Sequence, residues 1–165
     1  MEPRIRRIAA GILSLYIAFV FVQSLFFKFA DSPETQHIFG TLNAWAMGLG
    51  LPGVFARSGI FSQYVIGSAE LVASLLLLAG LLSGRVLLQG AGTLLSLAVI
   101  SGAIFFHLFT PLGIEVVNSD GSRDGGELFM LACGVWLSSV AILVMRRKVI
   151  LASLPGRHRT VKALA

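Results

Sequence analysis

Four long stretches of this sequence are almost free of charged residues. They cover residues 8–29, 60–82, 86–108 and 128–145, and each is close to the ~20 residues that a helix needs to cross a bilayer. Hydrophobic residues make up 56% of the chain and charged residues only 13%, which excludes an ordinary soluble domain. We therefore predict an all-α integral membrane protein. Four spanning helices should form one bundle within residues 1–148, followed by a basic tail at 149–165.

The first connection between predicted spans contains the signs of a short additional helix. Ser32-Pro33-Glu34 is a typical helix start, with a capping hydroxyl, proline at the first helical position and an acid in the first turn. Apolar residues then recur at helical spacing through residues 34–47. We expect an interfacial helix here that lies on the membrane surface and covers the outer mouth of the bundle.

Basic residues are distributed unevenly between the two ends of the predicted spans. Ten of the 13 Lys and Arg residues lie in the N-terminal segment, the turn at Arg85 and the C-terminal segment. The two other connections hold Lys28, Arg57 and Arg123 together with most of the acids. The positive-inside rule then places both termini in the cytoplasm. Because the basic residues flank spans, we expect anionic lipid headgroups, and not nucleic acid, as their partners.

Glu70 is an ionisable residue inside the second apolar stretch. Such a group costs ~3 kcal/mol on membrane-insertion scales, so it marks a candidate functional site. Small and polar residues share its helix face, namely Gln63, Gly67, Ala73 and Ser74. Faces of this kind pack closely against neighbouring helices in a membrane. We expect the carboxyl of Glu70 to point into the bundle.

Other polar residues fall at a similar depth in the neighbouring spans. On the third span, Gln89, Ser96 and His107 lie within about 20° of one another around the helix axis and should also face inward. Gln23 reaches nearly the depth of Glu70, so it can be a hydrogen-bond partner of the acid. Lys28 and His107 lie higher and should form a mouth above it. The candidate catalytic residues are Glu70, His107 and Lys28, the candidate ligand-binding residues are Gln23, Gln63 and Glu127, and no metal site is expected.

Three short motifs connect these polar residues to a known family. The first motif starts at Glu70, reads ELVASLLLLAGLLSGR, and is followed at the end of the third span by Phe105-Phe106-His107. The second is Ser24-Leu25-Phe26-Phe27-Lys28-Phe29 at the end of the first span, and the third is Asp124-Gly125-Gly126-Glu127 before the fourth. Over most of residues 8–145 the chain resembles the DoxX family of small bacterial membrane proteins, although the family usually has glycine in place of Ser24. The resemblance implies a four-helix bundle in the bacterial inner membrane. It also implies a link to quinone-dependent thiosulfate oxidation, or to membrane complexes that handle thiol or oxidative stress.

The resemblance and the polar residues together leave two functions open. In the first, the chain is a quinone-linked or redox-associated subunit of a membrane oxidoreductase. Glu70 would carry a proton, His107 would relay it or bind a quinone oxygen, and Lys28 would hold an anion such as thiosulfate. In the second, it is a non-enzymatic accessory subunit or a binder of a small apolar or lipidic molecule, and the same polar cluster locks the bundle. Whether the chain is an enzyme stays open.

Sequence motifs for redox cofactors are missing from this chain. It has no flavin or dinucleotide fingerprint, no CxxC and no CxxCH, and no haem or metal motif is recognised. Quinone is therefore the candidate cofactor, and any other redox centre would belong to a partner. Besides membrane lipids, we expect a larger membrane complex or a homo-oligomer as the setting in which the chain works.

Overall fold

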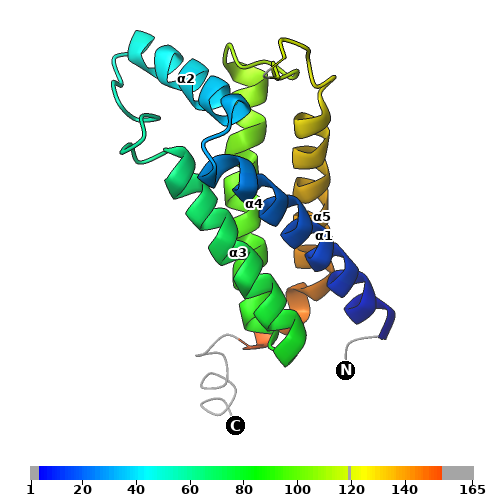
Figure 1. The fold of residues 1–165 in the computed structure, drawn as a ribbon. Coiled ribbons are helices and arrows are strands. Elements are labelled where there is room, and N and C mark those ends of the chain that lie inside the picture. Colours follow the sequence, from blue (N-terminus) through cyan, green and yellow to red (C-terminus); the bar gives the residue numbers. More distant parts are fainter. Residues whose placement is uncertain (1–3, 119, 154–165) are drawn as a thin grey trace.

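A computed structural model describes residues 4–118 and 120–153 of the chain (Figure 1). Within these residues five helices follow one another: α1 (Arg4–Phe29), α2 (Pro33–Gly48), α3 (Gln63–Ser83), α4 (Val86–Phe109) and α5 (Glu127–Ser153). Four of them, α1, α3, α4 and α5, are long and apolar enough to cross a membrane. The predicted all-α fold with four spans and one additional short helix is confirmed.

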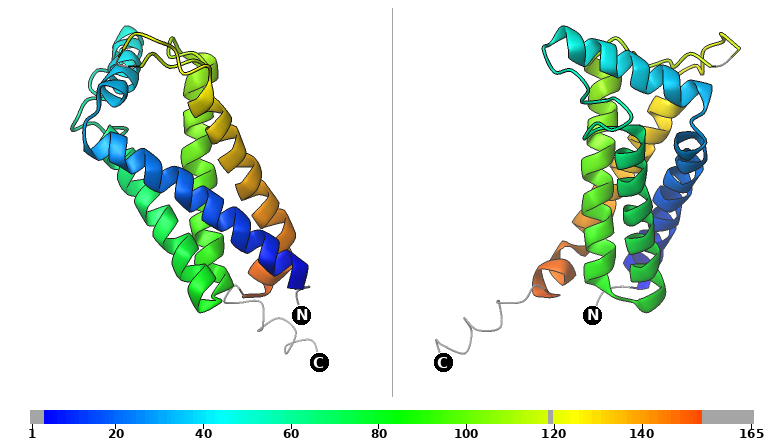
Figure 2. Two further views of the ribbon diagram at one scale, coloured as in Figure 1. Left: turned by 45° about the vertical axis from the view of Figure 1, so that its right-hand side comes forward. Right: turned by 60° about the vertical axis from the view of Figure 1, so that its left-hand side comes forward.

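The four long helices form a closed ring around one core (Figure 2). Helix α1 packs against α3 and α5, and α4 packs against the same two helices, so α1 and α4 lie diagonally across the bundle. The core contains Ile17, Phe21, Leu77, Val135 and Ile142. Large apolar side chains cover the outside of the ring as well, among them Ile12, Phe19, Leu75, Leu94, Leu137 and Val144. An apolar core with an equally apolar exterior defines a multi-pass membrane protein.

Helix α2 lies across one end of the bundle, which we call the α2 end (Figures 1 and 2). Its first turn has the predicted cap, because the hydroxyl of Ser32 accepts a hydrogen bond from the Thr35 amide at 3.3 Å. Leu42 and Ala46 of α2 are buried against Phe55 and against residues of the α4–α5 connection. The apolar face of α2 is therefore covered by protein. The opposite end of the bundle carries the α3–α4 turn, and we call it the Arg85 end.

The helix boundaries depart from the predicted spans by three residues or more at three places. Helix α1 begins at Arg4 and not at residue 8. Helix α3 begins at Gln63 and not at residue 60, because Ser62 caps it by accepting from the Val65 amide. Helix α5 continues past the predicted limit of 145 to Ser153, and Arg146 within it is buried. The extended part of α5 packs against α4, since a Cβ atom added to Gly90 of α4 would lie 3.4 Å from the side chain of Ile150. The start of the predicted tail is thus helical, and its remainder, residues 154–165, lies outside the described residues.

Candidate functional site

A buried ion pair joins α1 to α3 near the α2 end. Lys28 Nζ lies 2.9 Å from Glu70 Oε2 and 3.1 Å from Oε1. The hydroxyl of Ser24 donates to Glu70 Oε2 at 2.6 Å and accepts from Lys28 Nζ at 3.0 Å. Ser24 and Lys28 are four residues apart on α1, so they share the face that meets α3. We call these three residues the Ser24–Lys28–Glu70 triad.

The triad is largely closed off from its surroundings. The side chain of Glu70 is 7% exposed and that of Lys28 is 16% exposed. The aliphatic part of Lys28 lies over Gly67, where an added Cβ would be 3.5 Å from its Cδ. That distance is an ordinary van der Waals contact, and the tighter contact of the added Cβ is with Phe29 Cε2 at 3.2 Å, so the glycine at position 67 makes room chiefly for Phe29. The predicted inward direction of Glu70 and the predicted small face of α3 are both confirmed, since Gln63, Gly67, Ala73 and Ser74 are buried with it.

A second layer of hydrogen bonds holds the end of α1 against the start of α3. Gln63 Nε2 donates to the backbone oxygen of Lys28 at 2.9 Å and to Asp31 Oδ1 at 2.8 Å. The other carboxylate oxygen of Asp31 forms an ion pair with Arg57 of the α2–α3 connection. Asp31 has a positive φ of 55°, an uncommon backbone conformation that aspartate tolerates better than most residues. Gln63, a predicted ligand-binding residue, therefore serves here to fix the backbone above the triad.

The remaining predicted site residues lie elsewhere. Gln23 is exposed on α1 and is not the partner of Glu70, because the hydroxyl of Ser24 occupies that position. Glu127 is exposed at the start of α5. His107 is buried, with Nδ1 2.7 Å from the oxygen of Gly113 and its ring edge-on to Phe129 at 5.7 Å. The Phe129 contact places His107 between α4 and α5, at the opposite edge of the ring from the triad.

Asp124 organises the α4–α5 connection close to His107. Its Oδ1 accepts from the amides of Val116 at 2.8 Å and Gly126 at 2.9 Å, and its Oδ2 accepts from Leu128 at 3.1 Å. Burial raises the pKa of Asp124, but these amides and the nearby charge of His107 outweigh burial and hold the pKa below the usual 3.8. Asp124 is therefore an ionised cap for α5.

A separate polar contact lies deep in the other half of the bundle. Gln89 of α4 is 1% exposed, and its Nε2 donates to Ser14 Oγ at 2.7 Å and to the Ala10 oxygen at 3.3 Å. The predicted inward position of Gln89 is confirmed. On α1 the buried Ile17 and Phe21 lie between Ser14 and Ser24, so apolar side chains separate this contact from the triad.

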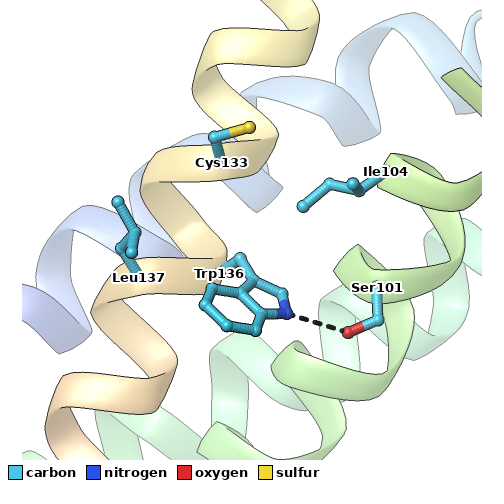
Figure 3. A pocket seen from close by; sticks show the side chains of 5 residues that line it. All are labelled: Ser101, Ile104, Cys133, Trp136 and Leu137. Carbon is cyan, nitrogen blue, oxygen red and sulfur yellow. Dashed lines mark hydrogen bonds between the residues drawn. The ribbon is translucent and has the colours of Figure 1, made fainter. Parts of the chain in front are cut away.

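A shallow groove runs between α4 and α5 on the outside of the ring (Figure 3). Its volume is about 450 Å³, and its lining is almost entirely apolar. The indole Nε1 of Trp136 donates to Ser101 Oγ at 3.2 Å, and Cys133 lies one turn away on α5. This groove and the triad are on opposite edges of the ring, because α1 and α3 form the edge facing away from α4 and α5.

Sequence reasoning missed Ser24, Asp31 and Arg57 as parts of this site. Ser24 could have been found, since it lies one turn before Lys28 on the same helix face. Asp31 and Arg57 are in connections without periodicity, so their contact depends on the tertiary fold alone. Within residues 4–118 and 120–153 no group of three or more His, Cys, Asp or Glu side chains could hold a metal ion.

No protein-family model, curated protein or solved structure matches this chain. The class of protein is therefore defined by the fold and the site alone. The chain is a multi-pass membrane protein with four candidate spans and a buried Ser24–Lys28–Glu70 triad near one end of the bundle.

Proposed function

We propose that the chain is a DoxX-like subunit of a quinone-linked or redox-associated membrane oxidoreductase, and that the triad is its proton-handling site. The observation that carries this proposal is the direct contact of a carboxylate, an ammonium and a hydroxyl inside an apolar bundle. Ionisable groups at such positions are rare in spanning helices and occur where protons or ions are handled. The motif resemblance supplies the link to quinone.

Quinone reduction consumes protons, which a group of this kind can deliver. A quinone takes up two electrons and two protons, and the protons must reach it through apolar surroundings. Glu70 carries a carboxylate that can bind a proton, and Lys28 and Ser24 hold that carboxylate in place through direct hydrogen bonds. The electrons would come from a substrate such as thiosulfate or from a partner subunit. In this proposal the chain lies in the bacterial inner membrane with the Arg85 end and both termini in the cytoplasm.

The experiment is a comparison of Glu70→Gln with Glu115→Gln in membranes where each variant is the only copy of the chain. Thiosulfate-dependent reduction of a short-chain ubiquinone is followed by its ultraviolet absorbance. We expect Glu70→Gln to lower the rate about 100-fold, since the amide keeps the shape but cannot carry a proton. Glu115 is an exposed acid at the α2 end, so its variant should retain the wild-type rate. Full activity in Glu70→Gln would exclude the proton role, and wild-type membranes no more active than empty-vector membranes would exclude the quinone-linked reaction.

A second candidate function, binding of a small apolar or lipidic molecule, is favoured by the groove between α4 and α5 (Figure 3). Its walls are apolar, and one hydroxyl, that of Ser101, offers a polar contact beside the flat indole of Trp136. The chain has two tryptophans, so Trp45→Phe leaves Trp136 as the fluorescent probe. Saturable quenching of this variant by decylubiquinone would support the binding function, and linear quenching equal to that of free tryptophan in the same detergent would contradict it.

A further inference from the structure

The α2–α3 connection, residues 49–62, exposes an unusual amount of apolar surface. Leu49, Leu51, Ile60 and Phe61 are between 43% and 69% exposed. The charged residue of this connection is Arg57, whose exposed guanidinium is ion-paired with Asp31. Four large apolar side chains in a segment that does not span the membrane need a covering partner, because water is an unfavourable surrounding for them.

The other connection at the α2 end has the opposite character. Residues 110–126 between α4 and α5 carry Glu115, Asp120, Arg123 and Asp124, and the first three of these are exposed together with one large apolar side chain, that of Ile114. Their hydrogen bonds and the exposed ion pair between Arg123 and Glu115 are typical of a surface in contact with water. The α2 end therefore has a polar side above α4 and α5 and an apolar side above α3.

The apolar side continues directly into the outer surface of α3. Val65, Val72 and Leu75 are exposed on this helix, and they belong to the surface that a spanning helix presents to lipid. In Figure 1 the connection descends from the end of α2 to the start of α3, beside the bundle and not over its axis. Leu42 and Ala46 of α2 are already buried by protein, and the large apolar side chain that α2 leaves exposed is that of Met47, in its last turn next to the connection.

Charge adds a second reason to choose lipid as the partner. Arg57 lies between the two apolar pairs, and two-thirds of its side chain is exposed despite its contact with Asp31. A guanidinium flanked by apolar side chains fits the boundary between acyl chains and anionic phosphates, where arginine binds headgroups while its neighbours enter the hydrocarbon.

We propose that residues 49–61 insert into the interfacial layer of the bilayer beside α3 as a shallow anchor. The anchor is formed by the loop and not by α2, and the ion pair between Arg57 and Asp31 ties the loop to the end of α1. This inference does not depend on the proposed redox function, because it follows from exposure, continuity with α3 and charge alone.

Spin labels at single cysteines provide the test. In a Cys133→Ser background, labels are placed at Leu51→Cys and Ile60→Cys, with Leu49→Cys as an additional site and Ser122→Cys as the matched control on the polar connection. The full-length protein is reconstituted in vesicles of phosphatidylcholine and phosphatidylglycerol. Collisions with oxygen, which concentrates in lipid, are then compared with collisions with a water-soluble nickel chelate.

We expect the labels at positions 51 and 60 to collide more often with oxygen than with the nickel chelate, and the label at 122 to show the reverse. Equal access of the nickel chelate to positions 51, 60 and 122 would overturn the proposal, because the connection would then be in water. Protection of positions 51 and 60 from both reagents would overturn it as well and would assign the surface to a protein contact. If one variant does not elute as a folded species, the label at position 49 replaces it.

Discussion

The ammonium of Lys28 lies within 3.1 Å of both carboxylate oxygens of Glu70, so a single side chain of α1 contacts both acceptor atoms on α3. Ser24 adds a third hydrogen bond to the same carboxylate. Removing either charge from so enclosed a pair leaves the other charge without its partner. Removing both leaves an apolar contact between two helices.

The first prediction concerns this pair and the stability of the bundle. Glu70→Leu and Lys28→Met should each lower the free energy of unfolding by about 3 kcal/mol, because each leaves a buried charge without its partner. The double variant should recover most of that loss. Unfolding in mixed detergent micelles, followed by circular dichroism, gives the coupling free energy between the two positions.

An exposed ion pair serves as the control for that cycle. Arg123 and Glu115 are 3.3 Å apart and largely exposed, so the same analysis there should give a coupling close to zero. Equal coupling energies for the two pairs would show that burial of the triad does not strengthen its ion pair.

The second prediction concerns the close approach of α3 and α4. A Cβ atom on Gly92 would lie 2.8 Å from the Leu77 nitrogen and 2.9 Å from the Ala73 oxygen, and both are backbone atoms that cannot move aside easily. Gly92→Ala should therefore destabilise the bundle by about 1–3 kcal/mol.

Gly102 on the same helix is the matched control for Gly92. Nothing lies within 4 Å of its added Cβ, so Gly102→Ala should be neutral or slightly stabilising. The measurement is the same micelle unfolding. Similar losses for both variants would contradict the assignment of the Gly92 effect to its contact with α3, because helix propensity favours alanine at both positions.

The third prediction is a pH dependence in the α4–α5 connection. Because the pKa of folded Asp124 lies below 3.8, its ionised carboxylate stabilises the connection at every pH above the unfolded value. That stabilisation is lost as the pH falls through the folded pKa. Amide protection factors at Val116, Gly126 and Leu128 should thus stay constant from about pH 8 to 5 and fall below about pH 4.

Substitution of Asp124 distinguishes the contribution of its carboxylate from other effects of low pH on the protein. Asp124→Ala should lower the protection of the same three amides at neutral pH, because their acceptor is gone. Amides within α3 should keep their protection in this variant. If the amides of Val116, Gly126 and Leu128 in the wild-type protein lost protection from exchange between pH 8 and 5, the assignment of Asp124 as the ionised cap of α5 would be contradicted.

Much of the α3 interface was predictable because helical spacing fixes which residues share a face. Gln63, Gly67, Glu70, Ala73 and Ser74 were grouped from the sequence, and all five are buried together. The cap of α2 was predictable for a similar reason, since Ser32 and Pro33 determine the start of the helix through local hydrogen bonds and backbone angles.

The partners across the helices could not be derived in the same way. Depth alone made Gln23 as good a partner for Glu70 as Ser24, and only the rotation of α1 about its axis distinguishes them. Depth also placed His107 at a mouth above the acid, although the ring order of the helices separates the two residues. The contact between Asp31 and Arg57 joins two connections whose paths are determined by tertiary packing.

The most direct test of the account is the sidedness of the two bundle ends. All conclusions about the triad require that α3 and α4 each cross the membrane, with the turn at Arg85 on one side and the α4–α5 connection on the other. Reporter fusions after Arg85 and after Asp120, using paired alkaline phosphatase and green fluorescent protein, measure this in intact bacteria. We predict a cytoplasmic signal after Arg85 and a periplasmic signal after Asp120. The same sidedness at both positions would contradict the four-span bundle.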